Sequence, residues 1–93
     1  MKNHQSMLAS FGAWLFQQAR QTEDEQSLEQ VHVIAFGMSE LLSTGEIFDQ
    51  LLYDLFTEIM LYIDHRRWKK NGSHNLEHIE QEIIRYLLEL EES

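Results

Sequence analysis

The chain has 93 residues, no cysteine and no proline, and its formal net charge is −9 at pH 7. A chain of this length is expected to form a single domain, residues 1–93. The lack of cysteine excludes disulfides, thiolate zinc sites and cysteine nucleophiles. The lack of proline, with only four glycines, favours a mostly helical fold.

The first predicted helix covers about residues 3–20. Its apolar residues recur at i, i+3, i+4 and i+7, which places them on one face of a helix. Met7 and Trp14 widen that face, and we expect Trp14 to be shielded from water. The face itself consists of Leu8, Phe11, Gly12, Leu15 and Ala19.

The second predicted helix follows the stretch "TEDE" and continues to about residue 42. Thr22 with Glu25 three residues later fits a capping box, and Ser27 with Gln30 is a second candidate, so its start stays open over several residues. The apolar positions keep a 3-4-3-4 spacing typical of one buried helix face. They are Leu28, Val31, Ala35, Met38 and Leu42.

The third predicted helix covers about residues 45–70. Ser43 or Thr44 is expected to cap it, and Gly45 to end the helix before it. Apolar residues occupy most of the circumference of this helix, so it should be buried on more than one side and lie at the centre of the fold. Its main inner face consists of Phe48, Leu52, Leu55, Ile59 and Tyr62.

The fourth predicted helix covers about residues 75–91, after a turn at Asn71-Gly72. Its inner face is expected to contain Leu76, Ile79, Ile83, Tyr86 or Leu87, and Leu90. The sequence therefore predicts an all-α fold: an antiparallel bundle of about four helices with short loops, in which the third helix is central.

Positive charge is concentrated at the end of the third helix, where four of the seven Lys and Arg stand within five residues. One interpretation is that these residues stabilise the negative C-terminal end of their own helix. The other is a contact site for a protein partner, since Trp and Arg are enriched at binding hot spots. On that hypothesis, with Trp68 exposed, the partner-binding residues are Arg66, Arg67, Trp68, Lys69 and Lys70.

Histidines offer two weaker hypotheses. His74 and His78 have the i, i+4 spacing of helical metal ligands, but the catalytic zinc pattern requires Glu where the chain has Asn75. His32 in a helical bundle resembles the histidine phosphotransfer domains. Those domains carry a Lys and a Gly a few residues after the His. In this chain Gly37 stands one position later than the glycine of those domains. We expect His32 to be partly buried and hydrogen-bonded, and we assign no metal, cofactor or catalytic residue.

Gly12 and Gly37 each lie inside a predicted helix, where a glycine costs about 1 kcal/mol relative to alanine. A glycine at such a position is either tolerated on the surface or required where two helices approach closely. Gly12 has Ala9 and Ala13 beside it, which favours close approach there.

The sequence predicts a small acidic protein that is not an enzyme and acts by protein–protein interaction, as a regulator, inhibitor or adaptor. The alternative is a nucleic-acid-associated regulator that uses residues 66–70, although sixteen Asp and Glu disfavour contact with phosphates. A phosphotransfer or metal-dependent enzyme is a third hypothesis. The large apolar surface of the third helix predicts a homodimer. Without a signal peptide or an apolar run that could span a membrane, we expect a cytoplasmic protein.

Overall fold

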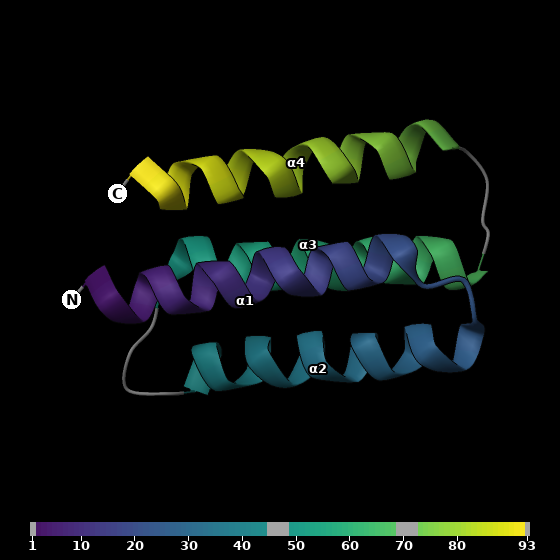
Figure 1. The fold of residues 1–93 in the computed structure, drawn as a ribbon, viewed down its shortest axis with the longest axis horizontal. Helices are drawn as coiled ribbons and strands as arrows, with labels where there is room; N and C mark the ends of the chain where they lie inside the picture. Colours follow the sequence, from purple (N-terminus) through teal and green to yellow (C-terminus); the bar gives the residue numbers. More distant parts are fainter. Residues whose placement is uncertain (1, 45–48, 69–72, 93) are drawn as a thin grey trace.

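A computed structural model describes residues 2–44, 49–68 and 73–92. These residues form four α-helices and no strand, which confirms the predicted all-α fold (Figure 1). The helices are α1 (Lys2–Gln21), α2 (Glu25–Thr44), α3 (Gln50–Trp68) and α4 (Ser73–Glu92).

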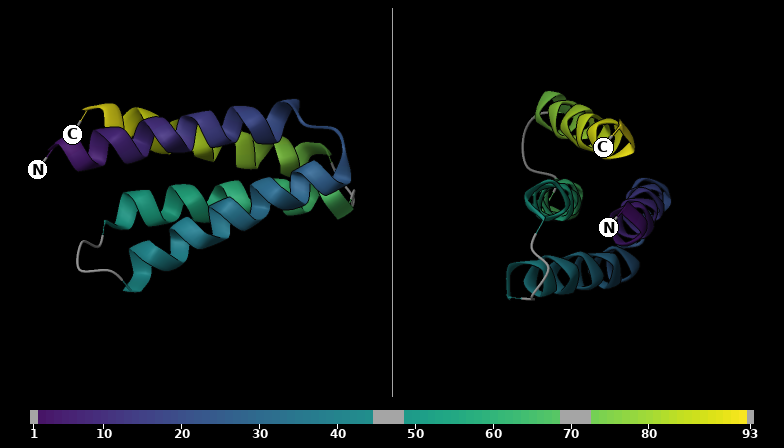
Figure 2. Two further views of the ribbon diagram at one scale, coloured as in Figure 1. Left: turned by 60° about the horizontal axis from the view of Figure 1, so that its bottom comes forward. Right: turned by 90° about the vertical axis from the view of Figure 1, so that its left-hand side faces the viewer.

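Consecutive helices run in opposite directions, so α1 and α3 are parallel to each other. α3 contacts all three other helices, whereas the described parts of α2 and α4 do not touch (Figure 2). α2 and α4 therefore cover opposite sides of α3, and α1 closes a third side. This arrangement confirms that α3 is the central helix, as its nearly continuous apolar circumference predicts.

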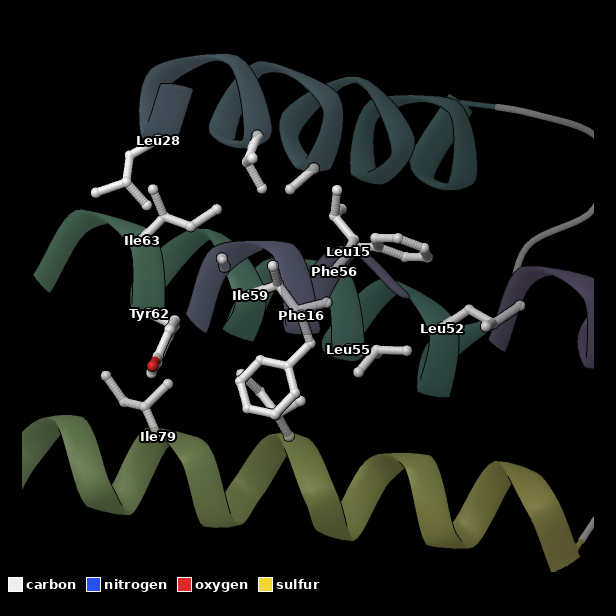
Figure 3. Packing of buried hydrophobic residues seen from close by; sticks show 14 of the residues in the cluster. Leu15, Phe16, Leu28, Leu52, Leu55, Phe56, Ile59, Tyr62, Ile63 and Ile79 are labelled. Atoms are coloured by element: carbon white, nitrogen blue, oxygen red, sulfur yellow. The ribbon is translucent and has the colours of Figure 1, made fainter. Parts of the chain in front are cut away.

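Each helix contributes its predicted apolar face to one core (Figure 3). α3 supplies the largest share because it is surrounded on three sides. Leu55, Phe56, Ile59 and Ile63 of α3 are completely buried, together with Leu15 and Ile83 from its neighbours. Phe48 of the predicted α3 face lies outside the described residues.

Aspartates cap two of the helices, and both differ from the predicted caps. Asp24 Oδ2 accepts a hydrogen bond of 2.8 Å from the Ser27 N–H, so neither Thr22 nor Ser27 is the N-cap of α2. Asp49 Oδ1 accepts one of 3.2 Å from Leu52 N–H at the start of α3. α3 thus begins at Gln50, later than predicted.

Ser43 and Thr44, predicted to cap α3, instead belong to the last turn of α2. Both hydroxyls donate to the carbonyl of Glu40, at 3.1 and 2.8 Å. These side chains satisfy a carbonyl of the helix end that they belong to, which is the alternative use of Ser and Thr near helix termini. Gly45, predicted to end this helix, lies outside the described residues.

Trp14 is half exposed, contrary to the prediction that it is shielded. Its ring stacks on Phe11 at a centroid distance of 5.7 Å, on the edge of the α1 apolar face. Phe16 is buried in its place and meets the ring of Tyr62 edge-on at 5.3 Å. α1 is therefore rotated so that Phe16 faces the core, because α1 packs against α4 as well as α3.

The two helical glycines have different surroundings. A Cβ atom on Gly12 would lie 2.6 Å from Leu55 Cδ2, so the completely buried Leu55 side chain would have to shift to make room for it. A Cβ atom on Gly37 would meet nothing within 4 Å. Packing within one chain therefore explains Gly12 but gives no reason for Gly37.

We expect Gly12→Ala to lower the free energy of unfolding by about 1 kcal/mol, because the cost of overpacking a buried leucine exceeds the gain in helix propensity. In a Leu55→Ala background the same change should stabilise the protein, since the clash is removed. Denaturant unfolding of the four variants measures this coupling. An equal effect of Gly12→Ala in both backgrounds would contradict the close packing.

Candidate functional site

The predicted partner-binding residues lie at the end of α3. At this end of the bundle, which we call the basic pole, α1 also ends and α2 and α4 begin. Arg66 and Arg67 lie in its last turn and Trp68 is its last residue. The Trp68 side chain, Lys69 and Lys70 lie outside the described residues. Whether the five residues bind a partner stays a prediction, and the structure shows only what the two arginines contact within the chain.

Arg66 binds the C-terminal end of α1. Its Nη1 donates hydrogen bonds to three backbone carbonyls, with distances of 3.1 Å to Arg20 O and 2.6 Å to Thr22 O; the third acceptor is Ala19 O. The last carbonyls of a helix have no partner within the helix and carry partial negative charge. A guanidinium supplies both donors and positive charge at that point.

Arg67 extends toward the start of α2, where its Nη2 lies 3.9 Å from Glu25 Oε2. Only 16 % of the Arg67 side chain is exposed, against 69 % for Glu25. The two arginines therefore bind α1 and α2, respectively, to the end of α3. Arg66 thus stabilises the end of a neighbouring helix, whereas stabilisation of the end of α3 itself stays a prediction.

A third set of contacts joins α4 to the same pole. The Tyr62 hydroxyl donates to Glu80 Oε2 at 2.9 Å, and Arg20 Nε lies 3.7 Å from the same oxygen. The Arg20 guanidinium also lies over the ring of Phe16, 5.4 Å from its centroid. Burial, followed by the hydrogen bond and charge of Glu80, raises the pKa of Tyr62 to about 12. Glu80 thus links α1, α3 and α4.

His32 lies where α2 packs against α3, as a partly buried side chain. Its Nε2 is 3.2 Å from Asp64 Oδ1, and 23 % of the side chain is exposed. This agrees with the expectation that His32 is partly buried, and its partner is a carboxylate of α3 at ion-pair distance. A neighbouring carboxylate at this distance gives the imidazole a structural contact between two helices.

The predicted metal pair falls partly outside the described residues, since nothing is described of the His74 side chain. His78 is exposed on α4. Across the parts of the chain that the structure describes, no three His, Asp or Glu side chains come together in a way that could hold a metal ion.

Carboxylates of α3 and α4 also approach each other away from the basic pole. Burial raises the pKa of Glu58, and the negative charges of Glu82 and Asp54 raise it further, against the opposing effects of His78 and Arg85. Such shifts mark functional sites in some proteins. Here the shift follows from the packing of Glu58 of α3 against α4.

Exposed apolar side chains form the feature that the sequence analysis missed. Four large ones stand within nine consecutive residues of α2: Val33, Ile34, Phe36 and Leu41. The sequence contained a sign of this exposed surface, because these four apolar residues do not occupy the positions with 3-4-3-4 spacing that form the inner face of α2. Each is at least 40 % exposed, and Leu41 is 65 % exposed.

Comparisons of this chain with known protein families, with curated proteins and with solved structures find no match.

We expect Arg66→Met to lower the free energy of unfolding by about 1–3 kcal/mol, because three carbonyls at the end of α1 lose a charged donor. Arg66→Lys keeps the charge but not the branched donor, so it should recover part of the loss. Denaturant unfolding measures both. Arg85→Met is the control, since Arg85 is exposed and, among the described residues, donates hydrogen bonds to Glu82 and Glu89 of its own helix. An Arg66→Met variant as stable as this control would contradict the assignment.

The raised pKa of Tyr62 predicts a loss of stability in alkali. In the unfolded chain the hydroxyl ionises near pH 10, whereas in the folded chain it keeps its proton up to about pH 12. The contribution is complete below pH 10 and is lost as the pH rises to about 12. Unfolding measured across this interval should show a shallower decline for Tyr62→Phe. Glu80→Gln, which keeps an acceptor but removes the charge, should lie between the two. A parent-like slope for Tyr62→Phe would contradict the prediction.

Proposed function

We propose that this chain is a non-enzymatic protein that acts by protein–protein interaction, as a regulator, inhibitor or adaptor, and that α2 presents its binding surface. The observation that carries the proposal is the set of four exposed apolar side chains between Val33 and Leu41. Single exposed apolar residues are ordinary on protein surfaces. Several on one short stretch of helix are typical of an interaction site.

The position of α2 supports this assignment. α2 packs on α3 and, less extensively, on α1, and its described residues do not touch α4. Figure 2 shows α2 along one edge of the bundle, with one long side against no other helix. The helix is therefore held firmly on its inner side while its outer side is open to a partner.

The charge distribution supports the same surface. Residues 30–39 contain no Asp, Glu, Lys or Arg, although the chain has 23 such residues, 16 acidic and seven basic. Charged residues are depleted from the centres of protein interfaces, where aromatic residues and methionine are enriched. By contrast, Arg66 and Arg67 of the predicted basic contact site are used in contacts with α1 and α2. We therefore place the partner surface on α2.

We also propose that the chain forms a homodimer, because closed two-fold dimers are the commonest way to cover such a surface. That the protein is cytoplasmic stays a prediction from the sequence. Among the described residues, no helix is both long and apolar enough to pass through a bilayer.

The test is affinity capture with the tagged chain and two matched variants. Phe36→Lys places a charge on α2 at a side chain that is 48 % exposed, and Leu88→Lys does so on α4 at one that is 54 % exposed. Neither change enters the core, so both variants should remain folded. We expect the parent and Leu88→Lys to retain the same protein in stoichiometric amount, and Phe36→Lys to lose it. Equal retention by all three, or no retained protein, would contradict the proposal.

A further inference from the structure

One side of α3 is covered by no helix among those described. α2 and α4 flank α3 on opposite sides and α1 closes a third, and Figure 2 shows the fourth side without a helix over it. Leu61 lies on this side, 42 % exposed, three residues from both Asp64 and Glu58. Asp64 contacts α2 through His32, and Glu58 faces α4, where Glu82 is a neighbour. We call the surface formed by Glu58, Leu61 and Asp64 the outer face of α3.

Phe36 of α2 borders this outer face. Two residues on the same side of α2 contact α3. His32, four residues before Phe36, has its Nε2 atom 3.2 Å from Asp64 Oδ1, and the Ser39 hydroxyl, three residues after it, lies 3.5 Å from Met60 Sδ. These contacts place Phe36, which is 48 % exposed, beside the part of α3 that carries the exposed leucine. Two large apolar side chains from different helices therefore belong to one exposed surface.

Carboxylates surround this apolar surface on α2 and α4. Glu29 and Glu40 are exposed on α2, seven residues before and four residues after the phenylalanine, which places them on its side of the helix. On α4, Glu82 and Glu89 both accept hydrogen bonds from Arg85, at 2.7 and 2.6 Å. This one arginine therefore serves two carboxylates, and the surface keeps an excess of negative charge.

The ionisation of Glu58 reports that excess. Burial, followed by the negative charges of Glu82 and Asp54, raises the pKa of Glu58 against the opposing effects of His78 and Arg85. The positive groups of the chain thus do not offset the repulsion between these carboxylates. A cation bound beside them is favoured, because it stabilises the ionised form of each.

We propose that the outer face of α3, together with Phe36 of α2, binds a cationic amphipathic helix of a partner protein. Apolar side chains of that helix contact Leu61 and Phe36, and its Lys and Arg pair with the carboxylates around them. An apolar centre with a charged rim is the usual composition of a protein interface, and amphipathic helices bind through their apolar face. This inference rests on the proposed protein-binding role of α2 and names the chemistry of the partner.

Charge complementarity selects this occupant. An acidic protein, or a second copy of this chain with its net charge of −9, brings further carboxylates to a surface that already has too many. Ile34 and Leu41 lie on another side of α2, because they are two residues before and five residues after Phe36. The proposed homodimer can therefore form through those two residues while the outer face of α3 stays open.

The test measures binding of a fluorescent synthetic helix by fluorescence anisotropy. The peptide has Leu at i, i+3, i+4 and i+7 and Lys elsewhere. A second peptide has the same composition in an order without an apolar face, and a third has Glu in place of Lys. Leu61→Lys places a charge on the outer face of α3. Ile84→Lys is the matched control, since Ile84 is 46 % exposed and lies on another side of α4 from Glu82. Denaturant unfolding checks that both variants are folded, and Phe36→Lys is a second variant on the same surface.

We expect the parent and Ile84→Lys to bind the first peptide equally, and Leu61→Lys and Phe36→Lys to raise the dissociation constant by more than about tenfold. The peptide without an apolar face should bind at least about tenfold more weakly, and the Glu peptide should not bind. Parent-like binding by folded Leu61→Lys, or equal binding of the first two peptides, would overturn the inference. In the affinity capture, a protein lost by Phe36→Lys but kept by Leu61→Lys would overturn the extension to α3 and leave the proposed role of α2 intact.

Discussion

The hydrogen bonds from Arg66 to the carbonyls at the end of α1 depend on, and stabilise, one arrangement of the bundle. Because they join the C-terminal end of α3 to that of α1, they form only when the two helices run parallel and end at the same level. α2 and α4, which run the other way, are then left to cover two opposite sides of α3. The close packing at Gly12 and the edge-on rings of Phe16 and Tyr62 hold the same pair of helices together along their length.

The positive charge of this acidic chain is concentrated where the ends of the helices need it. Arg66 serves α1, Arg67 lies beside the start of α2, and Arg20 shares Glu80 with Tyr62. A guanidinium bonded to several carbonyls contributes more than an exposed ion pair, because its donors satisfy groups that would otherwise lack partners. Arg66 and Arg67 thus contact helix ends that meet at this pole, whereas residues 30–39 of α2 contain no Asp, Glu, Lys or Arg.

The sequence was sufficient to predict the fold because the fold follows from local patterns. Apolar spacing identified most of the inner face of the helices, although on α1 Phe16 is buried and Trp14 is not, and the apolar circumference of α3 predicted its central position. The caps were missed at Asp24 and Asp49, because Ser and Thr nearby offered equally good patterns and only the three-dimensional path of the chain decides between them. The role of Arg66 could not be predicted either. Its acceptors lie on a helix whose position beside α3 is set by packing, which spacing along the chain does not encode.

The candidate surface on α2 could not be predicted from the sequence for a similar reason. Val33, Phe36 and Leu41 are apolar residues in a helix, and their spacing alone does not tell whether a neighbouring helix covers them. That depends on α2 occupying an edge position, out of reach of α4. Gly37 was likewise ambiguous until its surroundings were known, because a helical glycine fits both a tolerated position and a close contact.

The distance along the chain between Arg66 and its acceptors, 44 to 47 residues, also constrains the order in which the molecule can fold. A chain emerging from the ribosome presents α1 and α2 long before the guanidinium that completes α1. Until then the last turn of α1 has only water for its carbonyls, and it frays. All three connections between consecutive helices are short, so closing them costs little entropy, whereas the contact of Arg66 with α1 closes a much longer loop. The end of α1 is therefore completed only by a residue from the third helix.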